Sequence, residues 1–240
     1  MEVRIFNNAD EIAIACADIF TDLLTSKPAC VLGLATGASP VKTYNELIKR
    51  YKDGEISFKD VKTFNLDEYC NLPRDDKNSY YTFMHENLFN SVDIKEENVH
   101  ILDGNAEDAD KEAKAFDKMI DDEGGIDIQL LGIGTNGHIG FNEPAEAFSD
   151  GTFKVKLTDS TIKSNSIYFD DDSMPRYALT MGINSIMKAK KIVLIATGEA
   201  KADAIKATID GDVTPMVPAS ILKNHGDAVL LIDKAAAKLL

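Results

Sequence analysis

The chain has 240 residues, of which 44% are hydrophobic, so it can bury one substantial core, and we expect a single domain over residues 1–240. Its 40 acidic and 26 basic side chains give a formal net charge of -14, which disfavours nucleic acid and anionic membrane surfaces as partners. No apolar run approaches the roughly 20 residues that cross a bilayer, and the three cysteines fit no CxxC spacing, so we expect a cytoplasmic protein with reduced thiols.

Short β-rich runs alternate with longer segments of helical period along the chain. In chain order, we predict a strand over 3–6, a helix over 9–24, a strand over 30–34, a helix over 40–51, a strand over 61–66, a helix over 80–89, a strand over 99–102, a helix over 108–122, strands over 126–133, 153–157 and 177–181, a helix over 183–188, a strand over 191–196, helices over 201–209 and 219–223, and a strand over 228–232. The alternation predicts an α/β fold with an open, mostly parallel sheet and helices on both faces, a Rossmann-like three-layer sandwich.

Residues 33–40 (GLATGASP) join a predicted strand to the following helix, at the edge of the sheet where such folds bind ligands. Free amides at a helix start and the positive end of the helix dipole favour phosphate or another anion. The glycine spacing matches neither GxGxxG nor a P-loop. We expect Ser39 to cap the helix and Pro40 to occupy its first position. An anion site and an ordinary capped turn explain this segment equally well.

Residues 64–69 (FNLDEY) lie at the end of the next predicted strand. Asp67 and Glu68 are adjacent, so in an extended chain their side chains point in opposite directions and only one is expected to face the cleft. An acidic residue at a strand end is more often a turn former than a catalytic group. Asp67 therefore becomes a candidate only through the motifs that accompany it.

Residues 131–144 (LGIGTNGHIGFNEP) place Asn136, His138 and Glu143 in a glycine-rich turn after an apolar strand. Glycine lets the backbone approach a small ligand closely, and Glu143 can orient the imidazole and stabilise its protonated form. The alternatives are a structural histidine and a zinc site. No metal-ligand spacing connects any two of the four histidines, at positions 85, 100, 138 and 225, so we expect no metal.

The segments 33–40, 65–69 (NLDEY) and 132–144, followed by 217–222 (VPASIL), together resemble the glucosamine-6-phosphate deaminase family. The four motifs occur in order with similar spacing through almost the whole chain. The resemblance implies isomerisation and deamination of D-glucosamine 6-phosphate to D-fructose 6-phosphate and ammonia, without a cofactor or a metal. It also implies a small sugar phosphate as the partner of this chain.

By the same resemblance, Asp67 carries a proton from C2 to C1 of the open sugar, while His138 and its partner Glu143 open the ring. Asn136 stands two residues before the histidine, where many members of the family have aspartate. We count Asn136 among the catalytic residues and expect the asparagine to be tolerated at this position. Phosphate is expected to bind Thr36, Gly37, Ala38 and Ser39, with Lys201 adding a cation.

Two further departures from the family concern binding. Ile167 occupies a position where an arginine commonly grips the phosphate, so Lys163 or Arg176 would have to take its place. Phe153 and Val155 stand where allosterically activated members carry basic effector ligands, and we therefore expect no activation by N-acetylglucosamine 6-phosphate.

Two alternative functions remain at this point. A 6-phosphogluconolactonase of the sister family shares the fold and a comparable histidine turn, but the 142–144 (NEP) and 65–69 motifs favour the deaminase. A non-catalytic sugar-phosphate sensor would normally follow a DNA-binding segment, and the first strand is expected already at residue 3. We expect a monomer or a small homo-oligomer.

Overall fold

The computed structural model describes residues 1–166, 169 and 173–240. Its centre is a seven-stranded sheet in the order β1-β10-β9-β6-β2-β3-β5, and every pair of neighbouring strands in it is parallel. The order is consistent with the predicted open, mostly parallel sheet. The strands of this sheet are β1 (Glu2–Phe6), β2 (Val31–Leu34), β3 (Lys62–Asn65), β5 (Val99–His100), β6 (Ile128–Leu131), β9 (Lys191–Ala196) and β10 (Ala228–Asp233).

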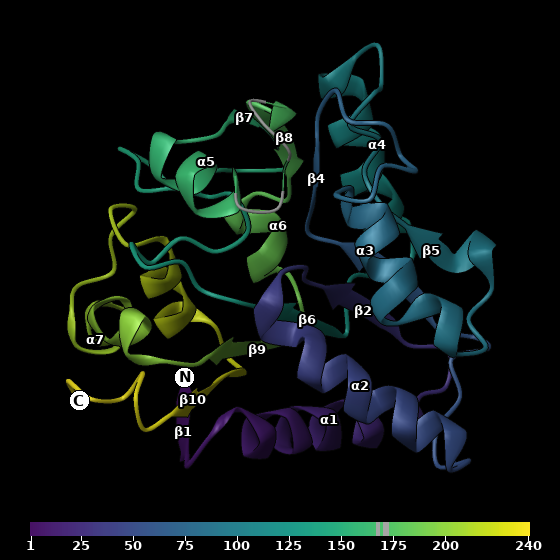
Figure 1. The fold of residues 1–240 in the computed structure, drawn as a ribbon, viewed down its shortest axis with the longest axis horizontal. Coiled ribbons are helices and arrows are strands. Elements are labelled where there is room, and N and C mark those ends of the chain that lie inside the picture. Colours follow the sequence, from purple (N-terminus) through teal and green to yellow (C-terminus); the bar gives the residue numbers. More distant parts are fainter. Residues whose placement is uncertain (167–168, 170–172) are drawn as a thin grey trace.

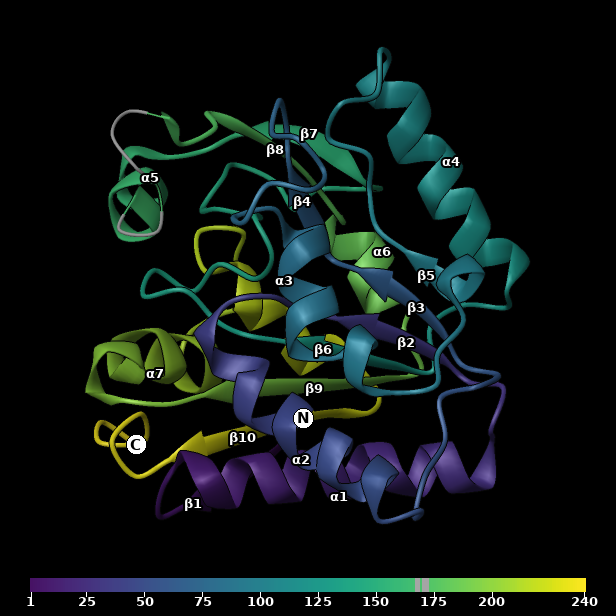
Figure 2. The same ribbon diagram turned by 45° about the vertical axis from the view of Figure 1, so that its right-hand side comes forward.

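Helices cover both faces of this sheet, which explains why the central strands β2, β6 and β9 are buried along almost all of their length. α1 and α2 pack against each other below the sheet, and α4 and α6 lie above it (Figures 1 and 2). The predicted three-layer α/β fold is thus confirmed. The helices are α1 (Ala9–Ser26), α2 (Ala38–Lys52), α3 (Tyr80–Asn87), α4 (Ala109–Asp122), α5 (Asp159–Asn165), α6 (Ile183–Met187) and α7 (Ala202–Asp210). No helix in the described part of the chain is long and apolar enough to cross a membrane.

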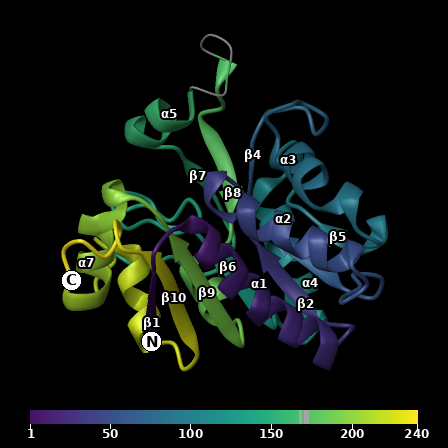
Figure 3. The same cartoon turned by 60° about the horizontal axis from the view of Figure 1, so that its bottom comes forward.

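A second sheet of three antiparallel strands stands beyond the carboxyl ends of the central strands (Figure 3). Its order is β4 (Asp67–Tyr69), β8 (Tyr177–Thr180) and β7 (Phe153–Lys156). The chain leaves β3 and enters β4 across Leu66 alone, and the Leu66 amide still donates to Leu34 of β2. Asp67 therefore stands where the two sheets meet.

Most predicted elements are present with shifted ends, and three differences bear on the site. α2 begins at Ala38, because Gly37 adopts φ +92 and turns the chain into the helix earlier than predicted, so Ser39 is not the cap and Pro40 is not the first helical residue. β4 and α5 were not predicted. The segment predicted as a helix over 219–223 is a 3₁₀ helix, Pro218–Asn224.

Candidate active site

A cavity of about 320 Å³ opens at the carboxyl edge of the central sheet, between its loops and α5. Loops after β2, β3 and β6 all contribute to its wall, as expected for an open parallel sheet. The sequence motifs at 33–40, 64–69 and 131–144 therefore meet in one place. The cavity is lined by Ala35, Thr36, Gly37, Ala38, Ser39, Leu66, Asp67, Tyr80, Gly132, Ile133, Gly134, Thr135, His138, Gly140, Phe141, Thr161, Asn165 and Lys201.

The first turn of α2 forms one end of this cavity. Gly37 precedes the helix, and no side chain caps the helix amides, so the positive end of the helix dipole faces a wall that also holds Thr36 and Ser39. A Cβ atom on Gly37 would meet nothing within 4 Å, which leaves open space beside this backbone. The turn thus has the features of an anion site.

Lys201 brings a positive charge to the same cavity. It ends the 3₁₀ helix Glu199–Lys201 that leads into α7, close to the predicted helix start. Burial lowers the pKa of its ammonium group from the ordinary value of 10.5, because the charged form is poorly solvated there. A bound dianion would offset that desolvation, so the lysine and the α2 turn suit a phosphate group together.

Asp67 and Glu68 point in opposite directions, as the extended chain predicts. The Asp67 side chain lines the cavity, whereas the Glu68 carboxylate accepts hydrogen bonds from the Tyr80 and Tyr81 amides, at 3.0 and 2.9 Å, and from its neighbour Tyr69 at 2.8 Å. Each acidic residue is only 6% exposed. The pleat of β4 thus places the two carboxyl groups on opposite faces of the strand.

The environment of Asp67 favours its protonated form. Burial, and secondly the nearby charge of Glu68, raise its pKa from 3.8 to about 8, against a smaller opposing effect of the Thr36 hydroxyl. A carboxyl group that titrates near neutral pH can both take up and release a proton during turnover. Asp67 is therefore chemically suited to carry a proton between two atoms of one ligand.

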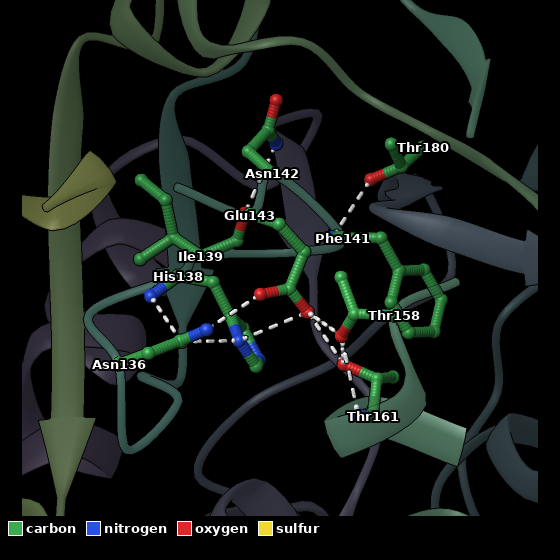
Figure 4. A network of polar contacts seen from close by, with 9 residues as sticks. All are labelled: Asn136, His138, Ile139, Phe141, Asn142, Glu143, Thr158, Thr161 and Thr180. Atoms are coloured by element: carbon green, nitrogen blue, oxygen red, sulfur yellow. Dashed lines mark hydrogen bonds and ion pairs between the residues drawn. The ribbon is translucent and has the colours of Figure 1, made fainter. Parts of the chain in front are cut away.

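His138 lies in a network of polar side chains on the loop after β6, drawn in Figure 4. Its Nδ1 atom faces two acceptors, Asn136 Oδ1 at 2.8 Å and Glu143 Oε1 at 3.4 Å. Since both partners are oxygens, Nδ1 carries the hydrogen and Nε2 is left as the basic nitrogen. The Asn136 Nδ2 atom donates to Glu143 Oε2 at 2.6 Å, so that Asn136, His138 and Glu143 are all in contact with one another.

Glu143 is held as an anion. Burial would raise its pKa, but hydrogen bonding and charge interaction with His138, and hydrogen bonds from Thr161 and Asn136, lower it from 4.5 to about 2. Thr158 also donates to the carboxylate, at 3.2 Å. A permanent negative charge beside Nδ1 stabilises the imidazolium that forms when Nε2 accepts a proton.

Two glycines allow this packing. A Cβ atom on Gly134 would lie 2.2 Å from the His138 ring, so only glycine leaves room for the imidazole. Gly140 has φ +55, and a Cβ there would approach Thr180 Oγ1 to 3.0 Å and Asp67 Oδ2 to 3.6 Å. The loop after β6 thereby comes close to the carboxyl group of Asp67.

Several contributors to the site were missed by the sequence reasoning. Tyr80 at the start of α3 and Asn165 at the end of α5 line the cavity, and Thr158 and Thr161 hold Glu143. Tyr80 and Asn165 carry no local motif. The Thr158 hydroxyl caps α5 by accepting from the Thr161 amide. A threonine followed three residues later by another polar residue was therefore the signal in the sequence that could have predicted the start of this helix.

Ile167, the position of the expected arginine, falls outside the described residues. Lys163 and Arg176 are exposed, and among the described residues Lys201 is the cation that lines the cavity. Phe153 and Val155 line a separate, mostly apolar pocket of about 280 Å³. Glu143 is also one of the residues that line this pocket. The described residues contain no cluster of three metal-ligating side chains.

Comparison with known proteins gives one consistent result. The family model for glucosamine-6-phosphate isomerases and 6-phosphogluconolactonases matches residues 7–231. A glucosamine-6-phosphate deaminase of Lysinibacillus sphaericus (strain C3-41) is 55% identical over 94% of this chain and 95% of the relative. A glucosamine-6-phosphate deaminase of Thermoanaerobacter sp. (strain X514) is 51% identical over 100% of this chain and 95% of the relative.

Solved structures agree with these matches. A structure described as a monomeric glucosamine-6-phosphate deaminase superposes with a TM-score of 0.97 at 42% identity, covering 100% of both chains. A 6-phosphogluconolactonase from Trypanosoma cruzi reaches a TM-score of 0.79 at 20% identity, over 100% of this chain and 96% of the other, and so shares the fold. The chain belongs to the family of glucosamine-6-phosphate isomerases and 6-phosphogluconolactonases.

Proposed function

We propose that this protein converts D-glucosamine 6-phosphate and water to D-fructose 6-phosphate and ammonia. The names of its close relatives support this reaction. The observation that carries it is that Asp67, at the start of β4, and His138, in the loop after β6, line the same cavity as the α2 turn and Lys201. One sugar phosphate can therefore contact a proton carrier, a base and an anion site at once.

The first step is opening of the pyranose ring. His138 Nε2 takes the proton of the anomeric hydroxyl and returns a proton to the ring oxygen, so that the C1–O5 bond breaks and an aldehyde forms at C1. Glu143 stabilises the transient imidazolium by its charge, and Asn136 fixes the hydrogen on Nδ1. An amide at position 136 orients the ring but adds no second negative charge.

The second step moves hydrogen between two carbons. In the open aldehyde the hydrogen on C2 is acidic, and ionised Asp67 removes it while the C1 oxygen takes up the proton that the substrate ammonium group releases, giving a neutral enolamine. Asp67 then returns the proton to C1, which leaves an imine at C2. Water adds to the imine and ammonia departs, so the reaction needs no change in oxidation state of the protein.

The phosphate group is proposed to bind the α2 turn at Thr36, Gly37, Ala38 and Ser39 together with Lys201. We further propose that the chain acts as one domain and as a monomer, which the monomeric relative supports. The three buried, unpaired cysteines suit a reducing cytoplasm.

The test is ammonia release from glucosamine 6-phosphate by the purified protein, followed by enzyme-coupled detection. We expect turnover by the wild type, none above background for Asp67→Asn, and little reaction with unphosphorylated glucosamine. Acid release from 6-phosphogluconolactone without ammonia release from the amino sugar would instead assign the protein to the lactonase branch.

A further inference from the structure

Glu68 is a buried acidic residue that the reaction described above does not use. Its side chain points away from the cavity and is 6% exposed. Its two oxygens accept three backbone hydrogen bonds, two of which come from the first residues of α3. Burying a charge is costly unless it is well bonded, so a neutral side chain would be the cheaper way to fill this space.

The helix that Glu68 holds contributes a wall of the active-site cavity. Tyr80 is the first residue of α3, and its side chain lines the cavity beside Thr36 and Asp67. The Tyr80 hydroxyl donates to the Tyr69 hydroxyl at 3.2 Å, and the Tyr80 ring stacks on Phe141 of the loop after β6 at 6.2 Å between centroids. A shift of the first turn of α3 would therefore move part of the cavity wall.

Ser79 already caps this helix by accepting from the Thr82 amide at 3.0 Å. The cap leaves the Tyr80 and Tyr81 amides to Glu68, so two side chains share the amides of one helix start. The Glu68 carboxylate additionally connects the start of α3 to β4, one residue after Asp67.

We propose that Glu68 is a positioning residue of the reaction: its carboxylate fixes Tyr80 against the cavity, and its negative charge stands behind Asp67. The inference rests on the proposed deaminase activity. The charge keeps Asp67 from ionising at low pH, so that it can both release and accept a proton under working conditions. Glu68 thus acts both on the position of Tyr80 and on the protonation of Asp67.

The charged and titratable groups near this pair are few. The Thr36 hydroxyl and the hydroxyls of Tyr69 and Tyr80 face Asp67, and Lys201 and His138 share its cavity. Burial raises the pKa of Glu68 above its ordinary value of 4.5, while the three backbone hydrogen bonds and the charge of Arg74 act in the opposite direction and favour the ionised form; Cys70 also lies near Glu68. Glu68 is the charged group among these that raises the pKa of Asp67.

The test compares Glu68→Gln with two controls at residues that also contact α3. Ser79→Ala removes the other cap without changing charge, and Glu96→Gln removes a mostly exposed carboxylate that contacts Tyr81 and His85. Two readouts are needed: the pH profile of kcat/KM from ammonia release, and the pH dependence of the free energy of unfolding. The second readout needs no substrate.

We expect Glu68→Gln to move the acid limb of the kcat/KM profile to lower pH by about one unit, since a like charge is removed from beside Asp67. The pH dependence of unfolding should move in the same direction. Both controls should keep the wild-type limb. An unmoved limb in Glu68→Gln would overturn the role of the charge, whatever its effect on stability.

Glu68→Asp separates the charge from the reach of the side chain and serves if Glu68→Gln does not fold. It keeps the charge but shortens the side chain by one methylene, so we expect the wild-type limb with kcat lowered about tenfold. Full activity in Glu68→Asp would overturn the positioning of Tyr80. Absence of ammonia release by the wild type would refute the proposed function, while the unfolding measurements would still test the Glu68–Asp67 interaction.

Discussion

Asp67→Asn should abolish turnover and at the same time stabilise the folded protein. The substitution keeps the shape of the side chain and removes its ability to carry a proton, so we expect kcat to fall by about 10²–10⁴-fold. Stability should rise because the pKa of the native carboxyl group is raised from 3.8 to about 8. Ionising it in the folded state is therefore unfavourable.

The sign and the size follow from proton linkage. Below about pH 4 the carboxyl group is protonated in both states, so it contributes no pH-dependent difference. Between about pH 4 and pH 8 only the unfolded state releases the proton, and wild-type stability falls by about 1.4 kcal/mol for each pH unit. The variant lacks this loss, so the gap between the two proteins reaches an upper limit of about 6 kcal/mol above pH 8.

Urea unfolding of both proteins at pH 5, 6, 7 and 8, followed by circular dichroism, measures this gap directly. The expected result is a gap that widens steadily with pH, accompanied by unchanged m-values. A constant gap across this range would refute the assignment of the raised pKa to Asp67. A gap that widens while turnover persists would remove Asp67 from the chemistry but leave its electrostatics intact.

Three further variants test the remaining parts of the site. His138→Ala should slow reaction of glucosamine 6-phosphate by about 10²–10⁴-fold, yet it should retain exchange of the C2 hydrogen in a 5-deoxy analogue that cannot form the pyranose; equal slowing of both would contradict a role in ring opening. Lys201→Met should raise KM about 10- to 100-fold, as loss of a charged hydrogen bond implies, and should weaken inhibition by inorganic phosphate; an unchanged KM would place the phosphate elsewhere. Gly134→Ala puts a methyl group within 2.2 Å of the His138 ring, so activity should fall with little change in the unfolding midpoint, and a fully active variant would show that the ring can move.

The sequence predicted those parts of the fold whose causes are local. Apolar runs such as the one ending at Leu34, and amphipathic segments such as α1, occur where they were expected. The start of α2 was misplaced because one glycine in the left-handed region decides it, and no periodicity reveals which residue takes that conformation. β4 was missed because its three residues become a strand only by pairing with β8, far away in the sequence.

The same distinction applies to the site. His138 and Glu143 were singled out because their own segment places polar groups among glycines after an apolar strand, and Asp67 because its motif accompanies the others. Tyr80 and Asn165 were not, since their place in the cavity arises from the packing of α3 and α5 onto loops that are distant in sequence. Glu68 was recognised only as the residue that faces away from Asp67.

Asp67 and Glu143 are held in opposite protonation states. Burial and the nearby charge of Glu68 raise the pKa of Asp67 to about 8, whereas the imidazole, an amide and two threonines hold Glu143 ionised, with a pKa of about 2. A reaction that shuttles a hydrogen between carbons needs a carboxyl group that exchanges its proton, and ring opening needs a fixed anion beside the base. The environments thus fit the different tasks proposed for two residues of the same chemical type, and exchanging their surroundings should remove both.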